Sequence, residues 1–425
     1  MPKRTSKTVR AALVALTATT IAATAIGPAA AATPAGAETG AESHAATQAA
    51  LNGLVAADMP GVAAGTLTPK GTWSGSAGYA DTATKRKRTA ADHFRAGSIT
   101  KTFVATVLLQ LEAEGKLSLD DSVEKWLPGV VKGNGYDANK ITIRHLLNHT
   151  SGVHDMVYTP EWNEQMNGQG FFEHRYDIKT PQQIVAMGIK YGPDFEPGKG
   201  WRYSNTNFVL GGMIIEKATG KPYAREVERR IVKPLGLKET SFPGTDPKLP
   251  APHPVGYSKL YVPDPGPEIY DATEYRPSWS GATGEVVSTS GDLNRFFSGL
   301  LQGKLLPKKQ LDEMLTTVET GEHYTYGLGI ISRKLTCGVQ VYGHDGVVWG
   351  SLTGAAGTRD GKHMLTFNIN GDWLNESPPF ENMFEGEFCG ALPKAAADKP
   401  AKETPAKKTP AKNAPASATA VNTLR

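Results

Sequence analysis

A serine and a lysine three residues apart, Ser98 and Lys101, are the pair in this sequence best suited to covalent chemistry. They stand at the start of an apolar run, residues 102–109, which predicts a buried helix that begins near Ser98. Residues three apart lie on one face of a helix, so the two side chains can meet. A hydroxyl becomes a nucleophile when a base takes its proton, and a lysine in an apolar setting can accept or relay that proton. The pair therefore predicts nucleophilic catalysis at Ser98.

The same spacing also has an ordinary structural explanation, and a single match is weak evidence. A serine near a helix N-cap and a lysine that extends toward solvent would give it as well. The chain contains a second match, Ser122 and Lys125, beside two aspartates, and we interpret that match as a solvated loop. A catalytic role for Ser98 and Lys101 therefore requires further motifs elsewhere in the chain.

Two further short motifs follow in the chain. Tyr203-Ser204-Asn205 precedes a predicted helix and is the only Y-x-N among fourteen tyrosines. His344-Asp345-Gly346 ends a strand-like run and is the only H-x-G motif in the chain. Each alone is more often structural, but together with Ser98 and Lys101, in this order, the three motifs are specific.

In this order the motifs resemble those of the penicillin-recognising serine hydrolases. This family includes the class C β-lactamases and, more closely, the secreted D-alanyl-D-alanine carboxypeptidases and D-peptidases of actinomycetes. The resemblance covers about residues 50–390 and extends to residues 143–152, 203–211 and 234–237 and to the spacing from Cys337 to His344. It implies an α/β fold of the β-lactamase/transpeptidase type, in which an antiparallel sheet from both chain ends, flanked by helices, adjoins an all-helical domain.

The resemblance also implies catalytic roles. Ser98 would attack the scissile carbonyl and become acylated, while Tyr203, kept near its anionic form by Lys101, would take the hydroxyl proton and return one to the leaving group. The backbone N–H groups of Ser98 and Val347 would stabilise the oxyanion. Asn205 would hold the acyl amide, and His344 would support the proton path or the far end of the substrate. The substrate-binding residues implied are Asn205, His344, Asp345, Gly346 and Val347.

The resemblance leaves several substrates open, because peptidases, amidases, esterases and β-lactamases of this family all form an acyl-serine. In the carboxypeptidase branch, two hydroxyl residues and an arginine hold the terminal carboxylate, and the corresponding positions here are Asp345, Val347 and Ile331. Asp345 would repel a carboxylate and attract an amine, unless it pairs with a neighbouring base, and Arg333 could replace the lost arginine. We expect small D-residue peptides, amides or esters, which could derive from peptidoglycan, and β-lactams as acylating ligands.

Rival function classes are weaker. An α/β-hydrolase would need a G-x-S-x-G nucleophile elbow, which the chain lacks. A non-enzymatic alternative is a penicillin- or cell-wall-binding module that kept the fold and lost turnover. His145 and His149 have helical i, i+4 spacing, but the glutamate of H-E-x-x-H is missing, so we expect no metal and no cofactor.

The two ends of the 425-residue chain differ from its middle. Residues 1–32 are basic, then apolar, then rich in small residues, which predicts a secretory signal peptide and an extracellular protein. Residues 393–425 form an Ala/Lys/Pro-rich tail that we expect to be disordered, either a linker or a contact to anionic cell wall. The whole chain has a net charge of +4, of which residues 1–36 contribute +4 and the tail +5. The body between them therefore has a net charge of −5, which argues against nucleic acid as a partner. No later stretch is long and apolar enough to span a membrane.

Apolar periodicity places strands near both ends of the folded part and helices between them. The strands are predicted at residues 61–68, 72–79, 326–332, 338–343, 347–355 and 363–370. We therefore predict a discontinuous α/β domain, residues 45–110 and 283–392, and a helical domain, residues 111–282, in a monomer. In an oxidising compartment the only two cysteines, Cys337 and Cys389, are most simply joined in a disulfide, with free thiols as the weaker alternative.

Overall fold

The computed structural model describes residues 44–393, except 263–265, 267 and 375–376. The predicted signal peptide and all of the predicted tail beyond residue 393 lie outside these residues. The described residues belong to one compact unit, so the boundary between the two predicted domains stays a prediction. Within the described part of the chain, no helix is both long enough and apolar enough to cross a bilayer.

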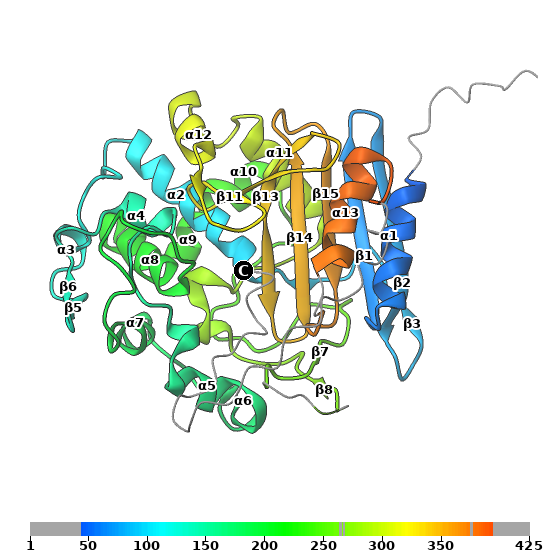
Figure 1. Ribbon diagram of the computed structural model, residues 1–425, viewed down its shortest axis with the longest axis horizontal. Coiled ribbons are helices and arrows are strands. Elements are labelled where there is room, and N and C mark those ends of the chain that lie inside the picture. The colour runs from blue at the N-terminus through cyan, green and yellow to red at the C-terminus, as the bar shows by residue number, and fades with distance from the viewer. Residues whose placement is uncertain (1–43, 263–265, 267, 375–376, 394–425) are drawn as a thin grey trace, which may run out of the picture. The chain divides into compact units, whose positions relative to one another are not determined.

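A nine-stranded sheet, antiparallel at every pairing, joins the two ends of the folded chain, as predicted (Figure 1). Strand β1 pairs with β15, with Val62 opposite Ile369. The strands, in their order across the sheet, are β10 (Val318–Glu319), β11 (Thr325–Tyr326), β12 (Ile331–Lys334), β13 (Gln340–Val348), β14 (Ser351–Thr358), β15 (Met364–Ile369), β1 (Gly61–Thr68), β2 (Gly71–Asp81) and β3 (Arg86–Lys87).

Three predicted strand runs have wrong boundaries. The run predicted at 326–332 is interrupted, because β11 ends at Tyr326 and β12 begins at Ile331, and Gly329 in the turn between them has φ +71°. The runs predicted at 338–343 and 347–355 are divided differently, because β13 continues to Val348 and turns at Trp349-Gly350, where Gly350 has φ +69°. Gly343 and Gly346 lie inside β13, and packing requires glycine at both positions. A Cβ on Gly343 would lie 1.8 Å from the carbonyl oxygen of Ala355.

Both faces of the sheet are covered by helices. Helices α1 (Ala45–Ala56) and α13 (Ser377–Cys389) lie side by side and share an apolar core with one face (Figure 1). Helix α11 (Ser290–Leu301) packs on β1, β14 and β15. Successive side chains of a strand point to opposite faces, and accordingly Ala355 and Ala356 of β14 belong to different cores.

Most of the regular elements between β3 and α11 are helices. Helix α2 (Thr100–Ala113) is buried on nearly every side and packs against α8, α9 and α12, which confirms the buried helix predicted after Ser98. The other helices are α3 (Val123–Trp126), α4 (Ile143–Leu147), α5 (Pro160–Met166), α6 (Gly168–His174), α7 (Pro181–Ile189), α8 (Asn205–Thr219), α9 (Tyr223–Val227), η3 (Glu228–Val232), α10 (Lys233–Leu235) and α12 (Lys308–Leu315). The short helical turns are η1 (Gly97–Ile99), η2 (Met156–Tyr158), η4 (Pro277–Trp279) and η5 (Gly281–Thr283).

Three short strand pairs stand apart from the main sheet. They are β4 (Phe94–Arg95) with β9 (Val287–Ser288), β5 (Lys132–Gly133) with β6 (Tyr136–Asp137), and β7 (Tyr257–Ser258) with β8 (Tyr270–Asp271). The first pair matters for function, because it holds the segment before Ser98 against residues 283–288. Ala96 extends this contact by donating its N–H to the carbonyl of Val286 at 2.8 Å.

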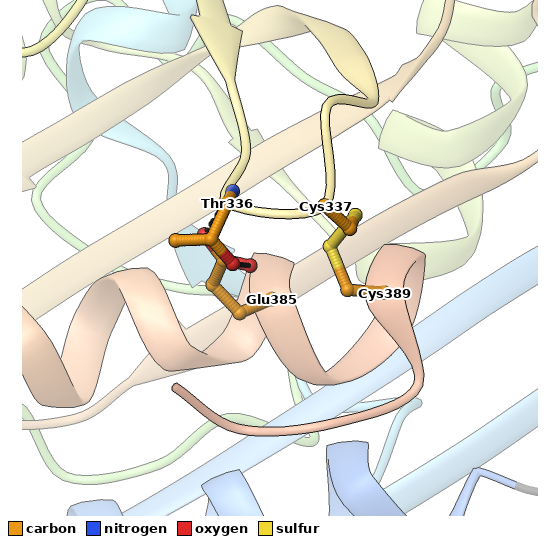
Figure 2. The surroundings of a disulfide bond; sticks show 4 residues. All are labelled: Thr336, Cys337, Glu385 and Cys389. Carbon is orange, nitrogen blue, oxygen red and sulfur yellow. Dashed lines mark hydrogen bonds between the residues drawn. A yellow bond between two sulfur atoms is a disulfide. The ribbon is translucent and has the colours of Figure 1, made fainter. Parts of the chain in front are cut away.

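A disulfide ties the β12–β13 turn to the last helix. Cys337 and Cys389 are bonded, with their Cα atoms 5.8 Å apart, which confirms the predicted pairing (Figure 2). Next to the bond, Glu385 of α13 accepts hydrogen bonds from the N–H and the hydroxyl of Thr336, at 2.9 and 2.6 Å. Covalent and polar contacts together hold the hairpin that carries β13.

Candidate active site

The predicted pair, Ser98 and Lys101, is brought together at the start of α2. Ser98 lies in the turn η1 and is partly exposed, whereas Lys101, one turn further on, is fully buried. The ammonium of Lys101 donates to Ser98 Oγ at 2.8 Å. Gly97 has φ +55°, and a Cβ there would lie 2.9 Å from the backbone nitrogen of Val347, so glycine allows β13 to approach the serine.

Lys101 is held by two further acceptors. Its Nζ donates to Asn205 Oδ1 at 2.8 Å and to the backbone carbonyl of Thr283 at 2.9 Å. With Ser98 Oγ these are three acceptors from three different segments, and together they hold the nitrogen beside the serine.

Asn205, the first residue of α8, connects Lys101 to a buried carboxylate. Its Oδ1 also accepts from the hydroxyl of Thr283 at 2.8 Å, and its Nδ2 donates to Asp155 Oδ2 at 2.8 Å. Asp155 is fully buried. These bonds orient the amide oxygen toward Lys101 and leave Nδ2 a second hydrogen for a substrate carbonyl. The sequence analysis missed Asp155 and Thr283, and the only signal for Asp155 was its place three residues after the resembling stretch 143–152.

Tyr203 lies beside Lys101, with the lysine Nζ 4.8 Å from the centroid of the tyrosine ring. Only 9% of the tyrosine is exposed. Its ring packs on that of His149 at 4.2 Å between centroids and lies 6.4 Å from that of His344. The structure thus brings together Ser98 of η1, Lys101 at the adjoining start of α2, and Tyr203 from the segment that precedes α8.

His344 lies in the wall of the site with both ring nitrogens engaged. Its Nδ1 lies 2.6 Å from the carbonyl oxygen of Asp345, which can only accept, so Nδ1 carries the proton. Its Nε2 therefore accepts from the hydroxyl of Tyr326 at 2.8 Å. Burial, together with the charge of Lys101, lowers the pKa of His344 to about 3, so the ring is neutral. No nitrogen remains for the substrate, and direct support of its far end, one of the two roles expected, does not fit this geometry.

Asp345 pairs with Arg333, the alternative that the sequence left open. The guanidinium of Arg333 contacts the Asp345 carboxylate, and its Nε lies 3.4 Å from Glu381 Oε1. Burial raises the pKa of Asp345 to about 6, although the charge of Arg333 acts in the opposite direction. Because its carboxylate is paired with Arg333, Asp345 is not placed to bind an amine of the substrate. Arg333, held between two carboxylates, is also not available to replace the missing carboxylate anchor.

Gly346 and Val347 carry β13 past the serine. A Cβ on Gly346 would lie 1.9 Å from the carbonyl oxygen of Ala96 and 3.0 Å from the nitrogen of Ser98. Only glycine permits this approach, and it brings the backbone of Val347 close to that of Ser98. A site in which both backbone N–H groups stabilise one oxyanion requires such proximity.

The second S-x-x-K match, Ser122 and Lys125, lies at the start of a short helix and not in a loop, and its two side chains do not contact each other as those of the first match do. Ser122 caps the short helix α3 by accepting from the backbone N–H of Lys125 at 3.2 Å. The side chain of Lys125 binds Asp121 at 2.6 Å instead of the serine. The prediction of a loop is wrong because the serine cap and the lysine that follows it stabilise one helical turn.

The described residues offer no convincing metal site. Among these residues only Cys337, Glu385 and Cys389 bring three ligand atoms within reach of one ion, and both sulfurs are in the disulfide.

Comparison with known proteins agrees with this geometry. Residues 30–384 match the protein family described as Beta-lactamase. A penicillin-binding protein of Bacillus subtilis (strain 168) is 33% identical over 286 residues, which are 64% of this chain and 59% of that protein. The chain therefore spans less than two thirds of the length of this curated relative.

Two solved structures are similar over nearly their whole length. A D-stereospecific amidohydrolase from Streptomyces sp. is 50% identical with a TM-score of 0.77, over 82% of this chain and 100% of that one. A D-amino acid amidase from Ochrobactrum anthropi SV3, complexed with D-phenylalanine, is 30% identical with a TM-score of 0.70, and the match covers 81% of this chain and 98% of that one.

Proposed function

The chain belongs to the beta-lactamase family of penicillin-recognising serine hydrolases, and from this premise we propose that it hydrolyses amides, esters and small peptides of D-amino acids. The observation that carries the proposal is the bridge made by Lys101, whose ammonium lies 2.8 Å from both Ser98 Oγ and Asn205 Oδ1. A buried cation in this position favours loss of the serine proton and the negative charge of a neighbouring tyrosinate.

In the proposed reaction, Ser98 Oγ attacks the substrate carbonyl while Tyr203 accepts the hydroxyl proton. The backbone N–H groups of Ser98 and Val347 stabilise the tetrahedral oxyanion. Tyr203 then gives the proton to the departing amine or alkoxide, which leaves an ester on Ser98. Water attacks this ester with Tyr203 again as the base, and the proton returns to Ser98 as the D-amino acid is released.

The lining of β12 and β13 supports a substrate without a free carboxylate near the scissile bond. Ile331 and Val347 offer no hydrogen-bond donor from their side chains, and Arg333 is already paired with Asp345 and Glu381. A terminal carboxylate would therefore lose its water without gaining a partner. The names of the two similar structures, an amidohydrolase and an amidase of D-amino acids, support the same substrate class.

The test compares four substrates of one enzyme preparation. These are D-phenylalanine amide, D-phenylalanine methyl ester, L-phenylalanine amide as the stereochemical control, and a diacylated Lys-D-Ala-D-Ala peptide. We expect kcat/KM for the D-amide and D-ester to exceed that for the peptide by about tenfold or more, the scale of losing a paired polar group. Efficient release of D-alanine from the peptide, with no preference for the amide or ester, would contradict the proposal.

We also propose that the protein is exported, because residues 1–32 have the order of a secretory signal. Mass spectrometry of protein from the culture medium of the source cells should find an N-terminus near residue 32. Full-length protein confined to the cell interior would contradict export.

A further inference from the structure

His149 lies directly behind Tyr203, in a position that the proposed mechanism does not use. The residue follows α4 and is fully buried. Its backbone has φ +62°, a left-handed conformation that is uncommon for residues other than glycine, although asparagine, aspartate and histidine adopt it more often than the rest. Its Nε2 is buried and has no hydrogen-bond partner among the described residues. Both features cost free energy, and such costs concentrate at functional sites.

His149 binds the backbone on both sides of Tyr203. Its carbonyl oxygen accepts from the N–H of Arg202 at 3.1 Å, and its Nδ1 accepts from the N–H of Ser204 at 3.1 Å. Tyr203 therefore stands between two residues that are both fixed to one histidine.

The orientation of the imidazole is itself fixed. The side-chain amide of Asn207 donates to the same Nδ1 at 3.2 Å, and Ser151 Oγ donates to the amide oxygen of Asn207 at 2.7 Å. Because Nδ1 accepts, the proton of the neutral ring is on Nε2. Burial and the nearby charge of Lys101 lower the pKa of His149, which keeps the ring neutral beside the lysine.

The plane of the imidazole lies against the phenol ring, with centroids 4.2 Å apart and a tilt of 31°. Tyr326 packs against both rings, with its centroid 4.8 Å from that of His149 and 6.1 Å from that of Tyr203. We propose that His149 is a positioning residue, which holds the ring and backbone of Tyr203 so that its oxygen reaches both Ser98 and the leaving group. The inference rests on the proposed role of Tyr203 and adds a residue to that mechanism.

The test uses His149→Asn. Asparagine tolerates the left-handed backbone, and its Oδ1 lies where Nδ1 was, so the bonds to Ser204 and Asn207 can persist while the ring is lost. The readout is the ratio of kcat/KM for D-phenylalanine amide to that for D-phenylalanine p-nitrophenyl ester. Both values report acylation, but only the amine leaving group needs a proton from Tyr203. A lower fraction of folded enzyme cancels in the ratio.

We expect the ratio to fall about tenfold or more in His149→Asn, because displacement of a catalytic group by about 1 Å can cost 10²-fold. The control is His145→Asn, since His145 also accepts a backbone N–H through Nδ1, from Thr142 at 3.3 Å, and caps α4 instead of supporting Tyr203. The control should leave the ratio unchanged. An unchanged ratio in His149→Asn, or an equal fall in His145→Asn, would overturn the inference.

Should His149→Asn fail to fold, Asn207→Ala replaces it, because it removes one of the two bonds that orient the imidazole. The ratio should then fall by a smaller factor, and equal losses on both substrates would overturn the inference. Tyr203→Phe separates this inference from the proposed function. If Tyr203→Phe keeps full activity, the proposed mechanism fails, whereas if it loses activity and His149→Asn does not move the ratio, only the role of His149 fails.

Discussion

At the scale of residues, the site is a chain of buried polar contacts that ends at one partly exposed hydroxyl. Asp155 orients Asn205, Asn205 holds Lys101, and Lys101 contacts Ser98, each at 2.8 Å. Ser98 is the only one of the four that is not buried. Fixed buried groups cost no reorganisation when the reaction proceeds, which is the main advantage of a preorganised site.

The base assignment makes a prediction for Tyr203→Phe. The phenylalanine keeps the ring between His149 and His344 and removes only the hydroxyl, so the fold should be preserved. Turnover of D-phenylalanine amide should fall by about 10² to 10⁴, the usual contribution of a general acid or base. Steady-state kinetics measures the loss of turnover, and a thermal unfolding curve shows whether the fold is preserved. Turnover near that of the wild-type enzyme would remove Tyr203 from the mechanism.

Sequence reasoning found the residues that motifs mark and missed those that act through buried contacts. Ser98 and Lys101 were predictable because a three-residue spacing on a helix is local geometry. Asp155 and Thr283 were not, because their roles depend on hydrogen bonds to Asn205 across 50 and 78 residues of sequence. His149 was considered as half of a zinc pair and as part of the resembling stretch 143–152, but nothing in the sequence shows that its ring faces Tyr203.

At the scale of elements, the segment 283–288 links the nucleophile helix to the surrounding structure. Its β9 strand pairs with β4, its Thr283 binds Lys101, and the N–H of Val286 donates to Thr100 Oγ1 at 3.0 Å. Between these contacts lies Glu285, which is buried beside the hydroxyl of Tyr223 and accepts from the N–H of Gly244 at 2.7 Å.

Glu285 should make the stability of this segment depend on pH. Burial raises its pKa to about 7 from 4.5, so the folded state binds a proton that the unfolded state has released between those values. This contribution is complete below pH 4.5 and is lost as the pH rises through about 7.

The matched variant is Glu285→Gln, which keeps the shape and cannot ionise. From pH 5 to pH 8 the free energy of unfolding of the wild-type protein should decrease relative to that of the variant. Chemical denaturation at both pH values measures the difference. Parallel pH profiles for the two proteins would show that Glu285 does not titrate in this range.

The disulfide should stabilise the hairpin that carries β13. It closes a loop of 52 residues, and the chain-entropy treatment gives about 4 kcal/mol for such a loop. The double variant Cys337→Ser/Cys389→Ser should lose about this amount in denaturant unfolding, while it keeps the contacts of Glu385 with Thr336. Two titratable thiols in the denatured, unreduced wild-type protein would contradict the bond.

The sequence predicted most elements but not the length of β13. Apolar alternation identified the central strands, but the predicted run ended at residue 343, whereas Gly343 and Gly346 both lie inside β13. In the structure these glycines are required by the close approach of Ala355 and Ala96. A glycine that breaks a strand and one that permits close packing look the same in a sequence, so only the fold separates them.

At the scale of the whole molecule, the sheet formed from both chain ends brings the site together. Strand β13 comes from the C-terminal part and η1 from the N-terminal part, and they meet where Gly97 adjoins Val347. Tyr203 and Asn205 come from the helical region between them. The pairing of β1 with β15, predictable from strands at both ends, thus positions residues that lie more than 200 positions apart in sequence.

Intact-mass spectrometry of the enzyme, quenched in acid during turnover of D-phenylalanine p-nitrophenyl ester, tests the central claim most directly. We expect one D-phenylalanyl group per molecule of the wild-type protein, and mass spectrometry of a digest should place it on the peptide that contains Ser98. Ser122→Ala should carry the same adduct, because Ser122 only caps α3. Ser98→Ala should show no adduct and should lose turnover. The wild-type adduct should decay once the substrate is exhausted. A stable adduct would indicate a binding module that does not turn over. An adduct on another residue, or turnover by Ser98→Ala near the wild-type rate, would contradict the account.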